Sequence, residues 1–244
     1  MIALLRIVVV AIFAVLMFIF GCGYCLLSPR NPKNVFVIGR LFSRIAGVLG
    51  YKLHLRLPED AYERGQHLYI ANHQNTWDLF TVSAAVTPKV VTVGKKSLLW
   101  IPLFGQIYWL TGNILIDRFN RTKAVGTIEQ VIQKMKESDL SVWMFPEGTR
   151  SRGRGLLPFK TGAFHTAVGA GVPIIPIVCS TTQGKLHLNK WNNGHVIVEM
   201  LPPISTEGCT KADVRKLATQ CRNEMKEKLA ELDAEVDKLN AGGK

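Results

Sequence analysis

The segment that most restricts how this chain can fold is an uncharged, strongly apolar run near its N-terminus. Residues 7–27 contain no Asp, Glu, Lys or Arg over 21 positions. As an α-helix, such a run would be about 31 Å long at ~1.5 Å per residue, which matches the ~30 Å hydrocarbon core of a bilayer. The sequence therefore predicts a membrane helix at the start of the chain.

Two processed forms compete with a retained helix. A cleavable signal peptide needs a small-residue cleavage site and a more basic start than Arg6 supplies. Residues 19–22 (IFGC) loosely resemble a lipoprotein cleavage box, but the bulky Phe20 stands where a small residue is expected. We therefore favour a retained helix. Its length and hydropathy permit either a spanning helix or one held in a single leaflet.

A second helical pattern follows a break at residues 28–32 (SPRNP), where two prolines end the first helix. Apolar side chains recur at helical spacing from Val35 to Leu49, and basic ones lie elsewhere on the wheel. A basic amphipathic helix beside a hydrophobic one is typical of an interfacial anchor, and the alternative is a helix of the core. The basic positions 30, 33, 40 and 44 outweigh Arg6, so the main domain is expected on the cytoplasmic side.

The remainder of the chain alternates short β-type runs with helical stretches. The expected strands cover residues 53–57, 67–71, 89–93, 113–117, 141–145, 174–179 and 196–200. The clearest helices cover residues 76–86, 122–137, 161–170 and 211–239. This alternation predicts an α/β fold with a mostly parallel central sheet flanked by helices, and the nearly continuous apolar runs indicate buried strands. We expect a two-helix membrane anchor over residues 1–50 and one α/β domain over residues 51–244.

The last predicted helix opens with a pattern similar to a capping box, formed by Thr210 and Asp213. Its apolar stripe runs from Val214 to Leu239 at helical spacing. We expect this stripe to pack on the domain, and a helix at a dimer interface is the alternative.

The charge balance favours anionic partners. Lys and Arg total 30 against 18 Asp and Glu, which gives a net charge of +12. The chain has no long basic block, no zinc-finger spacing and no repeated basic-aromatic motif, so we expect no nucleic acid partner. The five cysteines are scattered and odd in number, which fits a reducing compartment rather than a disulfide framework.

Residues 72–78 (NHQNTWD) supply a candidate general base. His73 directly follows a predicted strand, and Thr76 could cap the next helix and place Asp78 in its first turn. Neutral histidine is suited to accepting a proton near neutral pH, and a carboxylate on its far nitrogen would fix the tautomer. The alternative is a histidine–aspartate pair that merely ties a loop.

Residues 145–151 (FPEGTRS) supply a candidate anion site at the end of another strand. Pro146 ends the strand, Gly148 permits a tight turn, and Arg150 offers a planar fork of donors suited to phosphate. Lys160 lies near the start of the next predicted helix, where backbone N–H groups also favour anions. The alternative is that Glu147 pairs with Arg150 as a turn clamp. Taken together, the two motifs predict an enzyme that deprotonates a hydroxyl group on a phosphate-bearing substrate.

Four ordered blocks carry a resemblance that extends over nearly the whole chain. They are residues 72–78 (NHQNTWD), 112–118 (GNILIDR), 145–151 (FPEGTRS) and 172–177 (VPIIPI). On these blocks the chain is identified as a member of the glycerolipid acyltransferase family and resembles its lysophosphatidate acyltransferases in particular. It departs from the family pattern at Leu115, where the second block often carries an aromatic residue.

The resemblance implies a role for each matched position. His73 matches the general base and Asp78 its orienting partner, while Arg118 and Arg150 match residues that bind the acceptor phosphate. Glu147 and Gly148 match positions that shape the acceptor pocket, and Pro173 and Pro176 match a stretch for the acyl donor or the architecture of the site. From the residues themselves we add Thr149 as a further substrate contact and Lys160 as a further phosphate ligand.

The implied reaction is transfer of an acyl group from acyl-coenzyme A or acyl-acyl carrier protein to the sn-2 hydroxyl of 1-acyl-sn-glycerol-3-phosphate, which gives phosphatidic acid. Direct transfer is expected because no serine or cysteine lies in a recognisable nucleophile elbow. We expect no metal and no bound cofactor. The expected partners are membrane lipids, lysophosphatidic acid and the acyl donor, at the cytoplasmic face of a bacterial inner membrane.

Three alternatives remain at this point. The first is an acyltransferase for another lysophospholipid or glycerol 3-phosphate, the second a membrane thioesterase, and the third a non-enzymatic lipid- or nucleic-acid-binding module. Residues 98–104 and 107–110 are candidates for the lining of an apolar acyl tunnel.

Overall fold

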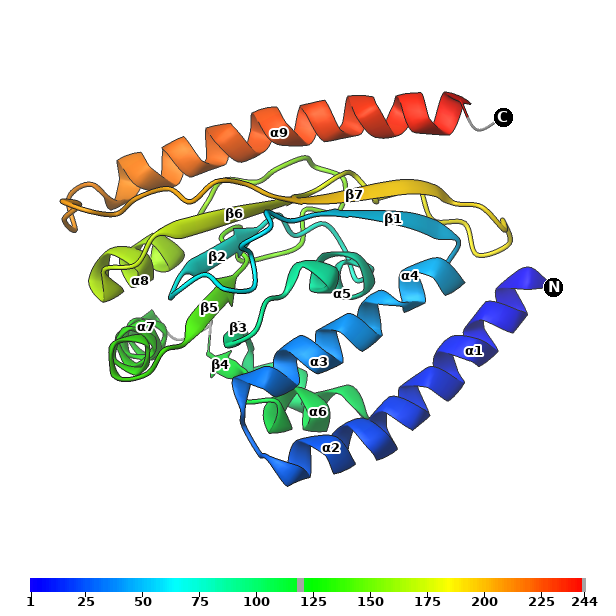
Figure 1. Ribbon diagram of the computed structural model, residues 1–244, viewed down its shortest axis with the longest axis horizontal. Helices are drawn as coiled ribbons and strands as arrows, with labels where there is room; N and C mark the ends of the chain where they lie inside the picture. Colours follow the sequence, from blue (N-terminus) through cyan, green and yellow to red (C-terminus); the bar gives the residue numbers. More distant parts are fainter. Residues whose placement is uncertain (118–120, 243–244) are drawn as a thin grey trace.

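A computed structural model describes residues 1–117 and 121–242, which form a seven-stranded sheet between helical layers (Figure 1). The strands lie in the order β1-β7-β6-β2-β5-β3-β4. Their bounds are β1 Tyr51–Arg56, β2 Leu68–Ala71, β3 Val90–Lys95, β4 Ile114–Ile116, β5 Ser141–Met144, β6 Ile174–Cys179 and β7 Gly194–Met200. All seven predicted strands are confirmed, with small shifts at their ends.

The sheet is mostly parallel, as predicted. β6, β2, β5, β3 and β4 run in one direction, while β7 pairs antiparallel with β6 and parallel with β1. Every residue of β2, β5 and β6 is buried, because these central strands are covered on both faces. The carboxyl ends of the five strands that run in the same direction meet at one edge of the sheet, where α/β proteins place their functional groups.

One face of the sheet is covered by α7 (Arg121–Glu137), α8 (Gly162–Ala170) and α9 (Val214–Gly242). Before α9, Asp213 Oδ2 accepts the Thr210 N–H at 2.9 Å and Thr210 Oγ1 accepts the Ala212 N–H at 3.2 Å. The capping arrangement predicted for these residues is therefore confirmed. The apolar stripe of α9 is buried against β6 and β7, as expected for a helix that packs on the domain.

The opposite face is covered by α3 (Pro32–Ser43), α4 (Ile45–Val48) and the short α5 (Asp78–Thr81). Pro32 begins α3, and the preceding Asn31 caps it by accepting the Lys33 N–H at 2.9 Å. Val35, Ile45 and Leu49 belong to the same buried cluster as the strands. The second predicted helix is thus part of the core on its apolar side, and its contact with a membrane stays a prediction, as does the boundary at residue 50.

The N-terminal apolar helix forms an outer layer beyond α3 (Figure 1). It comprises α1 (Ile2–Leu16), a π-helical turn over Met17–Gly21 and α2 (Cys22–Leu27). These 26 residues have a mean hydropathy of 3.0 over the most apolar stretch, and only 11% of that stretch is buried. By length and composition the helix can cross a membrane. α6 (Phe104–Leu110) packs against α2.

Arg6 fastens the start of this helix to the domain. Although it lies on an exposed apolar helix, its side chain is buried and its residue is only 4% exposed. Its guanidinium donates to the carbonyl oxygens of Val48, Leu188 and Trp191 at 2.9 Å each, and to that of His187 at 3.3 Å. These carbonyls belong to the end of α4 and to the loop between β6 and β7, so the helix and the domain share a polar contact as well as apolar ones.

Candidate active site

His73 and Asp78 form a close pair at the carboxyl edge of the sheet. His73 lies in the loop after β2, and Asp78 is the first residue of α5. His73 Nδ1 lies 2.7 Å from Asp78 Oδ2, and the side chains are 20% and 3% exposed. The predicted juxtaposition is confirmed, but the predicted cap is wrong. The residue before α5 is Trp77, not Thr76, and Asn75 Oδ1 accepts the Trp77 N–H at 2.8 Å.

The predicted helix over residues 76–86 is also shorter than expected. α5 ends after four residues and continues as a 3₁₀ turn over Val82–Ala85. The β-branched Thr81 and Val82 lie at this junction, and such residues favour α-helix weakly. The carboxylate of Asp78 nevertheless stays in the first helical turn, so its place beside His73 does not depend on a longer helix.

The donors around Asp78 indicate which tautomer His73 adopts. Asp78 Oδ2 also accepts the backbone N–H groups of Gln74 at 2.7 Å and Asn75 at 3.1 Å, so this oxygen acts as an acceptor. His73 Nδ1 must then carry a proton and donate it, which leaves Nε2 as the basic nitrogen. Asp78 Oδ1 is buried and has no hydrogen-bond partner among the described residues. All donors therefore converge on one oxygen.

Two further contacts fix the ring of His73 and its main chain. The ring stacks on Phe145, with centroids 4.2 Å apart and planes 23° from parallel. The His73 carbonyl accepts the Ser151 N–H at 2.8 Å, and the Gln74 carbonyl accepts the Arg152 N–H at 3.0 Å. The two motifs found in the sequence are thus joined to each other by backbone hydrogen bonds.

Glu147 is a bracket for the backbone, not a partner of Arg150. It is buried, and its Oε1 accepts the His73 N–H at 2.6 Å while its Oε2 accepts the Leu157 N–H at 2.9 Å. Burial raises the pKa of this carboxyl group, and the two N–H donors partly offset that rise. The alternative of a Glu147–Arg150 turn clamp receives no support from these contacts. The implied role in shaping the acceptor pocket stays a prediction.

The turn after Glu147 depends on glycine. Gly148 adopts φ +68°, and a Cβ atom there would come within 2.9 Å of the Lys160 side chain. The aliphatic part of Lys160 therefore lies over the turn, two residues before α8 begins. Thr149 and Lys160 are exposed and Arg150 is half-buried, so these predicted substrate contacts lie where solvent reaches them.

A network of amide side chains holds the His73 loop to the end of β6. Asn72 pairs with the backbone of Cys179 through both of its polar atoms, at 2.8 Å each. Gln74 Nε2 donates to the carbonyls of Cys179 and Ser180 at 2.9 Å, and Gln74 Oε1 accepts the Thr182 N–H at 2.8 Å. The sequence alone indicated no role for these amides. The available signal was three amide residues next to a buried strand, where polar groups need partners.

The second block supports the edge of the sheet. Asn113 Oδ1 accepts the Thr92 N–H at 2.8 Å, and Gly112 adopts φ +88° where a Cβ atom would come within 2.6 Å of the Arg30 carbonyl oxygen. Leu115 and Asp117 line a cavity of about 390 Å³ together with Lys96 and residues of α7. Arg118, the predicted phosphate ligand, lies outside the described residues.

The fourth block comprises the two residues before β6 and the first four residues of that strand. Pro176 is buried within the strand opposite Ile70, and its carbonyl accepts the Leu201 N–H at 2.8 Å. The Pro173 carbonyl accepts the Leu68 N–H at 2.9 Å, where β2 begins. Pro176 is thus part of the sheet and Pro173 directly precedes β6, while their architectural role stays a prediction. A role in donor binding stays a prediction.

No group of three His, Cys, Asp or Glu side chains that could hold a metal ion occurs within residues 1–117 and 121–242. The expectation that the site uses no metal and no bound cofactor stays a prediction. The described residues bring together a histidine and its carboxylate partner, with Arg150 and Lys160 on the neighbouring loop.

Comparison with known proteins defines the class. A sequence model described as Acyltransferase matches residues 52–180, so the chain belongs to the acyltransferase family. It is 58% identical to the 1-acyl-sn-glycerol-3-phosphate acyltransferase of Escherichia coli K12, over 244 residues and all of both chains. It is 36% identical to 1-acyl-sn-glycerol-3-phosphate acyltransferase alpha of Mus musculus, over 82% of this chain and 72% of the other. The resemblance drawn from the four blocks is therefore confirmed.

A solved structure supports the fold independently. The 1-acyl-sn-glycerophosphate (LPA) acyltransferase PlsC from Thermotoga maritima superposes with a TM-score of 0.74, and the match covers 95% of this chain and 96% of the other. The two sequences are 23% identical, so this likeness concerns the fold alone.

Proposed function

We propose that the protein transfers an acyl group from acyl-coenzyme A or acyl-acyl carrier protein to the sn-2 hydroxyl of 1-acyl-sn-glycerol-3-phosphate, which gives phosphatidic acid. The observation that carries this proposal is the 2.7 Å contact between His73 and Asp78, which leaves Nε2 of the ring as a base. The names of the full-length relatives support the choice of acceptor.

In the proposed mechanism, His73 Nε2 takes the proton of the sn-2 hydroxyl as its oxygen attacks the thioester carbonyl. Asp78 stabilises the resulting imidazolium through Nδ1. The tetrahedral intermediate then collapses, the carbon–sulfur bond breaks, and the leaving thiolate takes the proton from Nε2. The acyl group has moved from sulfur to oxygen, and His73 is neutral again, so no acyl-enzyme is needed.

Cations near this base would hold the acceptor phosphate. Arg150 follows the Glu147 bracket by three positions, and Lys160 covers the same turn, so a phosphate at this turn would lie near the His73 loop. We propose Arg150 as the principal ligand, with Lys160 and Arg118 as further ones. A planar guanidinium binds phosphate through paired hydrogen bonds, which also orients the glycerol carbon chain.

The apolar helix over Ile2–Leu27 supports membrane attachment, since a lysolipid acceptor resides in a bilayer. We propose the cytoplasmic face of a bacterial inner membrane as the site of action. The net charge of +12 favours both anionic lipid and a phosphate-bearing or acidic acyl donor.

The test is thiol release from acyl-coenzyme A by the purified, detergent-solubilised protein, with and without 1-acyl-sn-glycerol-3-phosphate. We expect release that requires the acceptor and yields phosphatidic acid. Release without acceptor would identify a thioesterase. Parallel reactions with acyl-acyl carrier protein, glycerol 3-phosphate and other lysophospholipids would separate a different donor or acceptor from a failure of the proposal.

Two variants assign the roles. His73→Ala should abolish turnover without unfolding the protein, because the ring is partly exposed and its removal leaves the backbone contact of His73 with Glu147 intact. Arg150→Ala should lower kcat/KM for the acceptor by roughly 10- to 150-fold, the value of a lost charged hydrogen bond of ~1.5–3 kcal/mol. Full activity of the His73 variant would refute the general-base assignment.

A further inference from the structure

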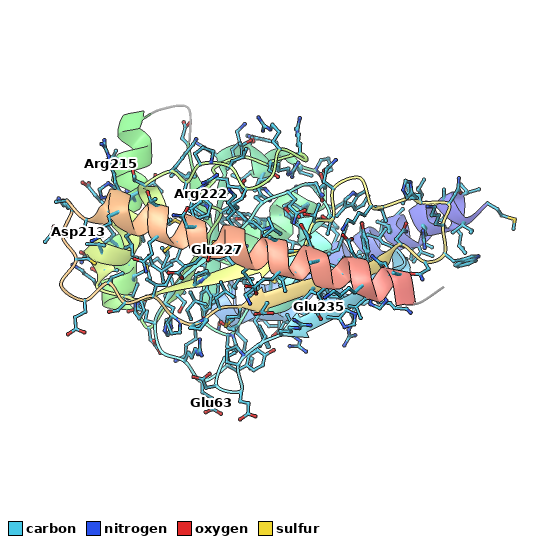
Figure 2. The ribbon with its side chains drawn as sticks, turned by 90° about the horizontal axis from the view of Figure 1, so that it is seen from above. Glu63, Asp213, Arg215, Arg222, Glu227 and Glu235 are labelled. Carbon is cyan, nitrogen blue, oxygen red and sulfur yellow. The ribbon has the colours of Figure 1, made fainter. Side chains whose placement is uncertain are left out.

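The last helix, α9, is tied by two side chains to the two loops that hold His73. Arg222 and Asp233 lie eleven positions apart in the sequence. Eleven residues correspond to about three helical turns at ~3.6 residues per turn, so the two side chains project from the same face about 16 Å apart. Figure 2 looks onto α9 and shows Arg222 on it, between Arg215 and Glu227.

Arg222 holds the loop that follows β5. Its Nε donates to the Leu157 carbonyl at 3.0 Å, and one of its terminal nitrogens donates to the Leu156 carbonyl at 2.8 Å. The Leu157 N–H in turn donates to Glu147 Oε2 at 2.9 Å, and Glu147 Oε1 accepts the His73 N–H at 2.6 Å. A short series of hydrogen bonds therefore leads from α9 to the main chain of His73.

Asp233 holds the loop that follows β6. Its Oδ1 accepts the Thr181 N–H at 2.6 Å, and its Oδ2 accepts the Thr181 hydroxyl at 2.6 Å. The adjacent Thr182 N–H donates to Gln74 Oε1 at 2.8 Å, and Thr182 Oγ1 accepts the Asn75 side-chain N–H at 3.0 Å. A second series of hydrogen bonds thus reaches the His73 loop from its other side.

Two other charged residues of α9, Asp237 and Arg215, make no hydrogen bond to the loops at the site among the described contacts. Asp237, one turn beyond Asp233, has a 74% exposed side chain 3.8 Å from Lys185, an arrangement that contributes little in solvent. Arg215 is exposed, and no hydrogen bond of its side chain occurs among the described contacts. Arg222 instead makes two charge-assisted bonds to loop carbonyls, and Asp233 makes two to the backbone N–H and the hydroxyl of Thr181.

We propose that α9 is a two-point clamp that positions His73, with Arg222 and Asp233 as its positioning residues. This inference rests on the proposed function, because it takes His73 as the base of the reaction. A base must meet its proton within a fraction of an ångström, and a ~1 Å misplacement by a remote change can cost on the order of 10²-fold in rate. Removing either clamp residue loosens one of the two loops without removing any side chain proposed to contact the substrate.

The experiment compares the full-length variants Arg222→Ala and Asp233→Ala with the matched controls Arg215→Ala and Asp237→Ala. For each we would measure kcat, both KM values and the thermal midpoint in detergent. We expect kcat to fall roughly tenfold in both clamp variants, because positioning acts on the chemical step. For Asp233→Ala the KM values should stay within about twofold of wild type, because the loop it holds carries none of the proposed phosphate ligands. For Arg222→Ala the KM for the acceptor should also rise, because the loop it holds carries Arg150 and Lys160. The controls should retain wild-type kcat.

Two further variants separate positioning from loss of fold. Asp233→Asn still accepts the Thr181 N–H and should recover most of the kcat. Asp233→Ala combined with Gln74→Ala should cost little more than the larger single effect, because both lie on one path to His73. Clamp variants that keep the kcat of their controls would overturn the proposal. So would a loss of kcat that only matches the loss of folded protein, or full additivity of the Asp233 and Gln74 changes.

The wild-type protein and His73→Ala, assayed together with these variants, separate the two proposals. An inactive wild type, or an active His73→Ala protein, means that the proposed function has failed. An active wild type and an inactive His73→Ala protein, with clamp variants equal to their controls, mean that the clamp alone has failed.

Discussion

Glu147→Gln tests two effects of one buried carboxylate. The first is that it positions His73, and the second is that its burial lowers the stability of the folded protein. The two carboxylate oxygens accept the backbone N–H groups of His73 and Leu157 at 2.6 and 2.9 Å. Glutamine has the same shape, but its single oxygen can accept from one of these donors, and its NH₂ group then opposes the other. The variant therefore removes one hydrogen bond and the charge together.

The two consequences for stability oppose each other. Loss of a hydrogen bond to a charged group costs about 1.5–3 kcal/mol. Burial raises the pKa of Glu147, which means that the ionised form is disfavoured in the folded protein and that its removal is favourable. We therefore expect the thermal midpoint of Glu147→Gln to lie within about 4 °C of wild type, equivalent to ~1 kcal/mol for a chain of this size. The kcat should fall at least about tenfold, because the His73 loop loses part of its bracket.

Glu147→Ala is the contrasting variant. It leaves both N–H groups without an acceptor, at about 1–3 kcal/mol each, so its thermal midpoint should fall well below that of the glutamine variant. Circular dichroism in detergent and the thiol-release assay would measure the two effects. A glutamine variant with wild-type kcat would refute the positioning role. A glutamine variant as unstable as the alanine variant would show that removal of the buried charge does not offset the lost hydrogen bond.

The raised pKa also fixes the sign of a pH effect. A carboxyl group whose pKa is higher in the folded than in the unfolded state binds more protons when folded, so it adds stability as the pH falls from neutral toward its ordinary value of 4.5. The stability of wild type relative to Glu147→Gln should therefore increase on acidification. A difference that stays constant, or that changes in the other direction, would contradict the assignment.

Three further outcomes follow from contacts described above. Asp78→Asn should lower kcat at least about 10²-fold with intact folding, since an amide no longer selects the tautomer with a basic Nε2; a near-normal rate would contradict this. Arg6→Ala should lower the free energy of unfolding in denaturant by at least about 3 kcal/mol, because three carbonyls lose a charged donor, while the exposed Arg44→Ala serves as control; equal stability of the two variants would contradict this. Thiol reagents should leave Cys179 and Cys221 of the folded protein unmodified, since burial raises the pKa of Cys221 to about 12 and that of Cys179 well above its usual range; rapid inactivation through either would point to a covalent thiol mechanism.

The sequence carries the fold well because its main signals are local and apolar. Seven short apolar runs became seven strands, since a parallel sheet buries its strands on both faces and leaves few other uses for such runs. The spacing of His73 and Asp78 across a strand end likewise sufficed to bring them together.

The parts that sequence reasoning missed depend on long-range polar contacts. In the sequence, Arg6 indicates only a weakly basic start to an apolar helix. In the structure it is buried, and its guanidinium donates to carbonyl oxygens more than 40 residues away along the chain. Glu147 reads as a pocket residue or a partner of Arg150, but it accepts backbone N–H groups from two loops. No local sequence pattern predicts these hydrogen-bond partners, because they come together only when the sheet forms and aligns the ends of its strands.

Because β7 runs antiparallel to β6 and parallel to β1, the loops that follow β1 and β2 lie at opposite edges of the sheet. The segment between β1 and β2 lies on the side away from His73, separated by the length of β2, four residues or about 13 Å at ~3.3 Å per residue. Glu63, in that segment, is exposed and stands clear of the sheet (Figure 2). A reporter domain or affinity sequence inserted there would travel with the enzyme without approaching its chemistry, which makes this loop the natural handle for imaging or purification.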